Sequence, residues 1–278
     1  MSKIQLIADT GCDLPDELIE KYNIHLIPVN VHFGERIYQD RMELSAEQFY
    51  QLMKTAPAPP TTSQINPDQY LQAFKQYTDQ DVDILVIGLS LKLTGSLQSA
   101  QIAKDMLGND RIHIFDSQSA SLGEGLYVLR AAEYIAEGLS VEEILAELRE
   151  YQQKAHGLIV LASLKHVLRT GRLSRPEAAL GSMLNIKPIL GLIDGEVLAT
   201  EKVRSLNRAL SVIIQRFEEL EIDFSNSTLA VAHANSHRMA EDFAAEVEAR
   251  LKPKRLIVNT AGAAIGAHVG QGGLGLFY

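Results

Sequence analysis

The stretch that decides the fold is Ile84-Leu85-Val86-Ile87-Gly88-Leu89-Ser90, together with the segment that follows it. Its apolar run has the length and composition of a buried strand. Leu97, Ala100, Ala103 and Met106 then recur at near-helical spacing, which predicts a helix directly after the strand. A strand that runs into a helix in this way is typical of an α/β sheet.

The residues Thr94, Gly95 and Ser96 separate this strand from this helix. Serine and threonine are preferred at helix starts because their oxygen accepts a hydrogen bond from a free amide. Glycine lets a ligand approach the backbone closely. A hydroxyl-rich loop at the amino end of a helix suits an anionic group, and it is equally compatible with an ordinary strand-to-helix turn. The stretch alone does not separate the two interpretations.

The same alternation extends through the first half of the chain. Strands are expected at 4–8, 24–33 and 111–115, and helices at 15–22, after Ser45, at 67–77, at 123–137 and after Ser140. This spacing predicts a parallel sheet with helices on both faces. Ligands of such sheets lie beyond the carboxyl ends of the strands. Hydroxyl-bearing loops at 9–13, 94–96 and 116–121 should meet there, and a fourth such loop, 61–64, enters a helix.

The pattern changes in the second half. Strands are expected at 157–162, 187–193, 196–203, 228–232 and 255–259, with helices at 164–168, 205–220 and 240–251. Asp194-Gly195 is a strong hairpin signal. A β-hairpin combined with strand–helix alternation predicts a mixed sheet. We therefore expect two α/β domains, an amino-terminal one over residues 1–155 with a mainly parallel sheet, and a second over 156–278 that ends in a glycine-rich tail.

The charge and composition narrow the classes of function. The net charge is −9, and residues 1–150 hold 11 Lys+Arg and 23 Asp+Glu, whereas residues 151–278 hold 15 and 12. This balance argues against nucleic-acid binding, which needs a basic surface. There is no apolar run long enough to span a bilayer, no signal peptide is recognised, and Cys12 is the single cysteine. A cytoplasmic protein without stable membrane insertion is expected.

Motifs that would indicate an enzyme or a metal site are weak. Residues 270–275 match G-x-G-x-x-G by letter, but no helix can follow them, so dinucleotide binding is rejected. The trio His233, His237 and Glu241 straddles a strand end and a loop, so no metal is expected. Neither a G-x-S-x-G elbow nor a P-loop is present. The sequence indicates a binding protein without catalytic residues or a cofactor, not a hydrolase.

Basic residues and one histidine leave alternatives open. Lys165, Arg169 and Arg172 form one cluster, and Lys202, Arg204 and Arg208 form another. Exposed Lys and Arg usually do nothing specific, yet two clusters in an acidic protein could bind a phosphate or an acidic partner. His268 lies among small residues of the tail. It is either a satisfied interior group or a group that binds an anion or moves a proton.

Taken together, the loops resemble the DegV family of bacterial proteins that bind long-chain fatty acids. The resemblance covers essentially the whole chain and is carried by segments in a particular order and spacing. These are Ala8-Asp9-Thr10-Gly11-Cys12-Asp13-Leu14, Thr61-Thr62-Ser63-Gln64, Leu93-Thr94-Gly95-Ser96-Leu97-Gln98-Ser99-Ala100, Phe115-Asp116-Ser117, Gly171-Arg172-Leu173-Ser174, Leu184-Asn185-Ile186-Lys187-Pro188-Ile189-Leu190 and Ile265-Gly266-Ala267-His268-Val269-Gly270.

The resemblance implies one long-chain fatty acid, of the palmitate, stearate or oleate type, in a tunnel between the two domains. It implies that Thr62 and Thr94-Gly95-Ser96 hold the carboxylate, with the choice between the Thr94 and Ser96 hydroxyls left open. It also implies that a separate fatty-acid kinase converts the bound acid into an acyl phosphate. Arg204 and His268, with Arg172 near the head group, are the residues implicated in that step.

Two rival functions remain. The fold resembles part of the dihydroxyacetone kinases, so the chain could be a small-molecule kinase or phosphotransferase subunit. That function needs a metal-phosphate site, which the sequence does not offer. Alternatively, the chain could be a lipid-responsive regulator. ATP hydrolysis by the protein alone would favour the first rival, and a pull-down that returns something other than a kinase would favour the second.

Overall fold

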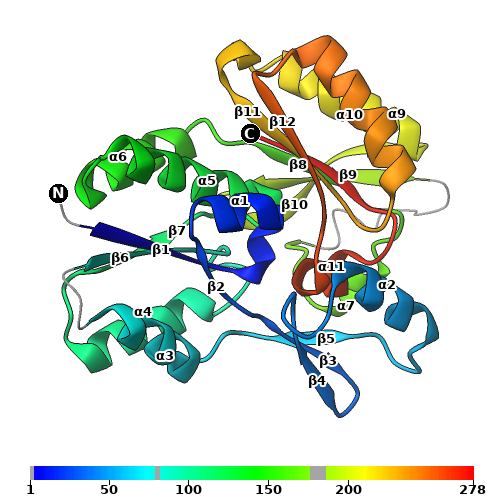
Figure 1. Cartoon of the computed structure of the whole chain (residues 1–278). Helices are drawn as coiled ribbons and strands as arrows, with labels where there is room; N and C mark the ends of the chain where they lie inside the picture. The colour runs from blue at the N-terminus through cyan, green and yellow to red at the C-terminus, as the bar shows by residue number, and fades with distance from the viewer. Residues whose placement is uncertain (1–2, 79–81, 176–185) are drawn as a thin grey trace.

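Four parallel strands form the first sheet, in the spatial order β2-β1-β6-β7. They are β1 (Lys3–Asp9), β2 (His25–Ile27), β6 (Val82–Gly88) and β7 (Ile112–Asp116). The computed structural model describes residues 3–78, 82–175 and 186–278. The predicted strand near residue 84 is therefore confirmed as β6, an inner strand of a parallel sheet (Figure 1).

Helices cover both faces of this sheet. They are α1 (Asp16–Lys21), α3 (Pro67–Thr78), α4 (Ser96–Leu107), α5 (Leu122–Glu137) and α6 (Val141–Gln152). Neighbouring residues of β6 point to opposite faces, as the strand period requires. Ile84 and Val86 pack with α3 and α4, whereas Leu85 and Ile87 pack with α5 and α6. The continuous apolar run of the sequence follows from this burial on both sides.

A small antiparallel sheet corrects two predictions. The single strand expected at 24–33 is two strands, β2 and β3 (Asn30–Phe33), because the chain leaves the first sheet around Pro28. The 61–64 segment, expected as a loop, contains the strand β5 (Thr61–Ser63). β3 pairs with β5 on one side and with β4 (Arg36–Gln39) on the other. The helix α2 (Ala46–Thr55) follows, with the predicted capping box at Ser45.

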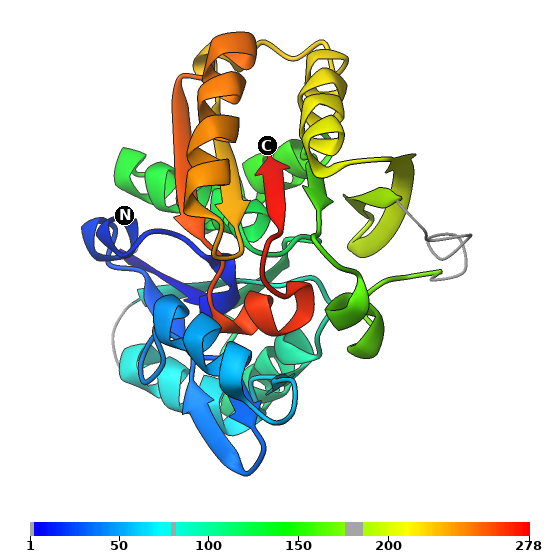
Figure 2. The ribbon, with the colours of Figure 1, turned by 90° about the vertical axis from the view of Figure 1, so that its right-hand side faces the viewer.

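The second sheet is mixed, as predicted, and has the order β10-β9-β8-β13-β11-β12. Its strands are β8 (Gly157–Val160), β9 (Lys187–Ile193), β10 (Glu196–Val203), β11 (Thr228–His233), β12 (Arg255–Thr260) and β13 (Leu274–Phe277). β11 and β12 are parallel and the other pairs are antiparallel. The helices α9 (Leu206–Glu218) and α10 (His237–Leu251) pack on its outer face (Figure 2).

The glycine-rich tail contributes regular structure that the sequence did not predict. It forms the helix α11 (Ala263–Val269) and then β13, which lies in the middle of the second sheet. Gly270 and Gly272 have φ of 70° and 92°, which glycine adopts readily, and they turn the chain from α11 into β13. The predicted domain division at residues 155 and 156 falls between α6 and β8, and the division itself remains a prediction.

Short helices complete the described chain. These are η1 (Thr10–Cys12), η2 (Phe224–Asn226) and α7 (Lys165–Arg169). Within the described residues, no helix is both long and apolar enough to cross a membrane.

Two carboxylates of the first half hold the start of α11. Asp13 accepts a hydrogen bond from the Gly262 amide at 2.8 Å, and Asp40 accepts one from the Ala263 amide at 2.9 Å. Ser121 donates to Asp13 at 2.6 Å. Carboxylates are favoured at a helix amino end because its free amides need acceptors. The acidic loop 9–13 therefore fastens α11, a helix of the second half, to the first sheet (Figure 1).

Burial makes these acids weak. Desolvation raises the pKa of Asp13 to about 7 and the pKa of Asp9 to about 6, and the neighbouring Asp40 adds to both shifts. Burial also raises the pKa of Glu124 well above its ordinary range, and neither carboxyl oxygen of Glu124 has a hydrogen-bond partner within the described residues. Arg41 is the nearby cation that opposes the shift of Asp13. The folded protein therefore keeps a proton that free carboxyl groups have lost by pH 7.

The Asp13→Asn variant tests this protonation. Between about pH 4 and pH 7 folded Asp13 is protonated while the unfolded chain has lost that proton, so unfolding releases it and rising pH favours unfolding. The stability of the parent relative to the variant should fall by roughly 1.4 kcal/mol per pH unit and level off above pH 7. Urea unfolding of both proteins from pH 5 to 8 measures this difference in stability. The buried histidines contribute to the pH dependence with the opposite sign, but they are present in both proteins, so their contribution cancels in the difference. A pH-independent difference in stability between parent and variant would contradict this prediction.

Candidate functional site

A cavity between the two large sheets is the candidate site. It holds about 1200 Å³ of space free of protein atoms, part of it open to solvent. Its floor comes from the loops that follow β6 and β7, and its roof comes from β8, β9, β11 and β13. α11 forms one side wall, through Ala264, Ile265 and His268. Of the three hydroxyl-bearing loops predicted to converge there, 94–96 and 116–121 contribute to the lining, whereas 9–13 does not and instead holds the start of α11.

Most of the lining is apolar. The apolar and glycine residues of the lining are Val29, Leu89, Leu93, Gly95, Ala120, Ile159, Leu161, Val167, Leu192, Val197, Ala232, Ala234, Ala261, Ala264, Ile265, Val269, Gly273, Leu274, Gly275 and Phe277. These residues are scattered over many elements and have no common spacing, so the sequence did not reveal them. Their side chains make most of the cavity unfavourable for ions and favourable for hydrocarbon.

Polar groups gather at the end of the cavity next to α4, which we call the polar end; its residues are Thr62, Ser63, Gln64, Thr94, Ser96, Arg172 and His268. The Thr62 hydroxyl lies 2.9 Å from Nε2 of His268, although the two residues are 206 positions apart. The strand β5 carries Thr62, and the last turn of α11 carries His268. The structure therefore brings together Thr62, His268 and the loop before α4, which the sequence analysis had named separately.

The start of α4 differs from the expected cap. Gly95 occupies the N-cap position, so the cap residue has no side-chain oxygen for the first amides. Ser96 Oγ instead accepts from the Ile65 amide at 3.2 Å and lies 3.0 Å from the Thr94 hydroxyl. A Cβ on Gly95 would approach Gln64 Oε1 to 2.3 Å, so a larger residue here would require the Gln64 side chain to move. The Ser96 amide, the first of the helix, donates to Thr94 Oγ1 at 3.4 Å, and Thr94, Gly95 and Ser96 at this end of α4 line the cavity.

His268 is neutral at physiological pH. Burial, together with the charges of Arg172 and Arg169, lowers its pKa to about 4. Its Nδ1 atom is buried without a hydrogen-bond partner in the described part of the chain. His268 therefore places a neutral imidazole that can form hydrogen bonds next to Thr62. No additional charged group has to be buried in the apolar cavity at this point.

The arginines named from the sequence have different positions. Arg172 lines the cavity, and its Nε atom donates to the Leu93 carbonyl at 3.2 Å. Arg204 is exposed beyond the end of β10 and is absent from the cavity lining. Arg204 therefore faces solvent and does not contribute to the polar end.

Two histidines of the second half lie close together. His233 ends β11, as expected, whereas His237 begins α10, three residues before the expected start of that helix, and their rings lie 4.6 Å apart. Burial and the adjacent His237 lower the pKa of His233 to about 4. In the portion of the chain described here, no group of three His, Cys, Asp or Glu residues could hold a metal ion. His233 does line the cavity, which the sequence analysis had not foreseen.

Comparisons with known proteins show the family to which this fold and sequence are similar. The family model "Uncharacterised protein, DegV family" matches residues 3–278. A DegV domain-containing protein of Caldanaerobacter subterraneus subsp. tengcongensis is 34% identical over 278 residues, which cover 100% of this chain and 99% of the relative.

Two solved structures are close to this fold. A DegV family protein of Thermus thermophilus, described as binding fatty acid, has a TM-score of 0.91 at 30% identity and covers 99% of this chain and 98% of its own. DegV of Bacillus subtilis, described as a fatty acid binding protein, has a TM-score of 0.91 at 32% identity, with coverage of 100% and 99%. On these matches over its whole described length, the chain belongs to the DegV family.

Proposed function

We propose that this protein binds one long-chain fatty acid, with the acyl chain in the apolar cavity and the carboxylate at the polar end beside α4. The observation that carries the proposal is a largely apolar cavity that ends in hydrogen-bond donors, the hydroxyls of Thr62 and Thr94 among them. The two DegV structures described as binding fatty acids, at 30% and 32% identity, support the same ligand class. The ligand would be of the palmitate, stearate or oleate type.

The apolar lining supplies the affinity. Burying an acyl chain of about fourteen methylenes contributes on the order of 10 kcal/mol at ~0.8 kcal/mol per methylene. Part of this is offset by the loss of ligand freedom on binding. The lining of leucine, isoleucine, valine and alanine has few polar atoms that would have to give up water, so most of this contribution is retained.

The polar end supplies the orientation. A buried carboxylate is costly unless it accepts hydrogen bonds. With its proton on Nε2, neutral His268 donates to Thr62 Oγ1, which leaves the Thr62 hydroxyl free to donate to the carboxylate. The amides at the start of α4 and the Thr94 hydroxyl are further donors. The helix end also favours an anion through its partial positive charge.

Native mass spectrometry of delipidated protein tests the proposal. We expect one palmitate per chain to bind at micromolar concentration. Hexadecanol, which keeps the chain and lacks the carboxylate, should bind much more weakly because it cannot accept hydrogen bonds from all these donors. Protein that shows no palmitate adduct under these conditions would end the proposal, and equal binding of the two lipids would refute the role of the polar end.

We further propose that the protein presents this carboxylate to a fatty-acid kinase, which forms the acyl phosphate. The proposal rests on the family resemblance and on the exposed position of Arg204, which suits contact with a partner. Arg204→Ala should slow turnover in an assay with kinase, ATP and bound acid, while acid binding stays unchanged. Arg149→Ala, a change at an exposed arginine of α6 outside both basic clusters, is the matched control. Unchanged turnover for Arg204→Ala would refute the role of this residue.

A further inference from the structure

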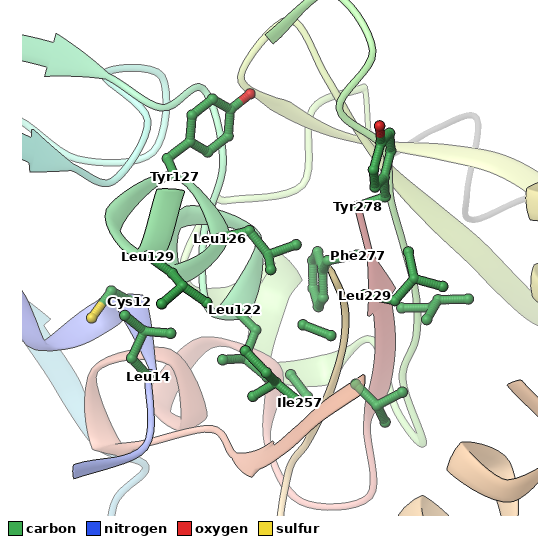
Figure 3. Packing of buried hydrophobic residues seen from close by; sticks show 14 of the residues in the cluster. Cys12, Leu14, Leu122, Leu126, Tyr127, Leu129, Leu229, Ile257, Phe277 and Tyr278 are labelled. Carbon is green, nitrogen blue, oxygen red and sulfur yellow. The ribbon is translucent and has the colours of Figure 1, made fainter. Parts of the chain in front are cut away.

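Phe277 closes one end of the cavity. It is 2% exposed and lies in β13, in the middle of the second sheet. Figure 3 shows its ring between Leu122 and Leu126 of α5 on one side and the second sheet on the other. The ring belongs both to the core and to the lining of the cavity. The side chain of Phe277 therefore forms one wall of the cavity.

The ring of Phe277 occupies a socket made by three glycines from three different elements. A Cβ on Gly123 of α5 would lie 2.8 Å from Cδ1 of the ring, and one on Gly157 of β8 would lie 2.9 Å from the same atom. A Cβ on Gly275 of β13 would lie 2.8 Å from Cε2. Close packing on these sides leaves the ring little freedom to swing aside, so it is a fixed wall rather than a mobile one.

On β11 and β8, the two strands next to β13, the lining also ends at the level of Phe277, although Leu192 of β9 lines the cavity at that level. In the ladder of β13 with β11, Gly275 pairs with Ala232, and Phe277 pairs with Ala230. Ala232 lines the cavity, whereas Ala230 is part of the core and does not. On the other side of β13, Phe277 pairs with Gly157, which is likewise absent from the lining.

Phe277 also lies at the far end from the polar end. β13 follows α11 after a short turn, so Leu274 is near the His268 side of the cavity. Phe277 is three residues further along the strand, about 10 Å away. Gly273, Leu274, Gly275 and Phe277 all line the cavity in this order. An acyl chain with its carboxylate at Thr62 would extend along β13 toward Phe277.

We propose that Phe277, held by Gly123, Gly157 and Gly275, is the stop that sets the maximum acyl length this protein accepts. The inference rests on the proposed fatty-acid function and names the residue that selects among fatty acids. A chain that ends before the ring gains contact with each added methylene. A longer chain meets the ring and must bend or leave its carboxylate outside the polar end.

Affinities for saturated acids from lauric to behenic acid test this proposal. In the parent protein, affinity should rise up to about fourfold per added methylene, and then stop rising at the length that reaches Phe277. In Phe277→Ala the break-point should move to longer acids, and Phe277→Leu, which disturbs the core less, should move it by a smaller amount. Ala232→Leu places a larger side chain just before the stop and should move the break-point to shorter acids.

Phe243→Ala is the matched control, because Phe243 is also 2% exposed in the same core and does not line the cavity. It should lower thermal stability and leave the break-point in place. A folded Phe277→Leu or Ala232→Leu protein with the parent's break-point would overturn the inference. Failure of the parent to bind any acid would instead overturn the proposed function, so the two failures are distinguishable.

Discussion

Replacing Ala264 with tryptophan is expected to weaken palmitate binding by at least about 100-fold. Ala264 is 4% exposed and lines the cavity from α11. The indole would occupy space that several methylenes of the acid need, and each displaced methylene lowers affinity about fourfold. Because the new side chain enters empty space, the fold should tolerate it better than an insertion into the packed core.

A graded series makes this test sharper. Isothermal titration of Ala264→Val, Ala264→Leu and Ala264→Trp should show affinity that falls as the side chain grows. Ala245→Trp adds the same atoms at an exposed position of α10 and should bind as the parent does. Parent-like affinity in a folded Ala264→Trp protein would mean that the acid lies elsewhere.

The Thr62→Val variant is expected to bind palmitate about 10- to 100-fold more weakly, at nearly unchanged volume. The substitution removes the hydroxyl that would donate to the carboxylate, and a hydrogen bond to a charged group contributes about 1.5–3 kcal/mol. It also leaves His268 Nε2 without the partner it has at 2.9 Å. The affinity for hexadecanol should change much less, because that lipid carries no charge.

Thr61→Val is the control for this change. Thr61 precedes Thr62 on β5, is exposed and does not line the cavity. Titration of both variants with palmitate separates the loss of a particular hydroxyl from a general disturbance of the strand. Equal affinities for the two variants would show that the Thr62 hydroxyl does not hold the ligand.

The sequence predicted the parts of the fold that local pattern determines. The apolar run at 84–90 and the strand–helix alternation around it predicted the parallel sheet, and Asp194-Gly195 predicted the β9-β10 hairpin. Both predictions succeeded because strand burial and turn conformation depend on local sequence. The hydroxyl-rich segments 61–64 and 94–96 were visible in the sequence, and the family resemblance assigned Thr62 and Thr94 to the carboxylate. Their use as carboxylate ligands remains a prediction.

Features that depend on distant contacts were not predictable in this way. β13 is short and glycine-rich, and it becomes a strand because β8 and β11 supply partners on both sides. The pairing of Thr62 with His268 joins residues from opposite ends of the chain. The arginines show the same limit, since Arg172 and Arg204 look alike in sequence, yet only Arg172 lines the cavity.

A crystal structure of the protein with ω-bromopalmitic acid tests the central claim most directly, because anomalous scattering locates the bromine and hence the direction of the chain. The account predicts a single bromine peak beside Phe277, with carboxylate density next to Thr62 and the start of α4. A bromine peak beside Thr62, or a cavity without ligand density while the acid lies on the surface, would contradict it.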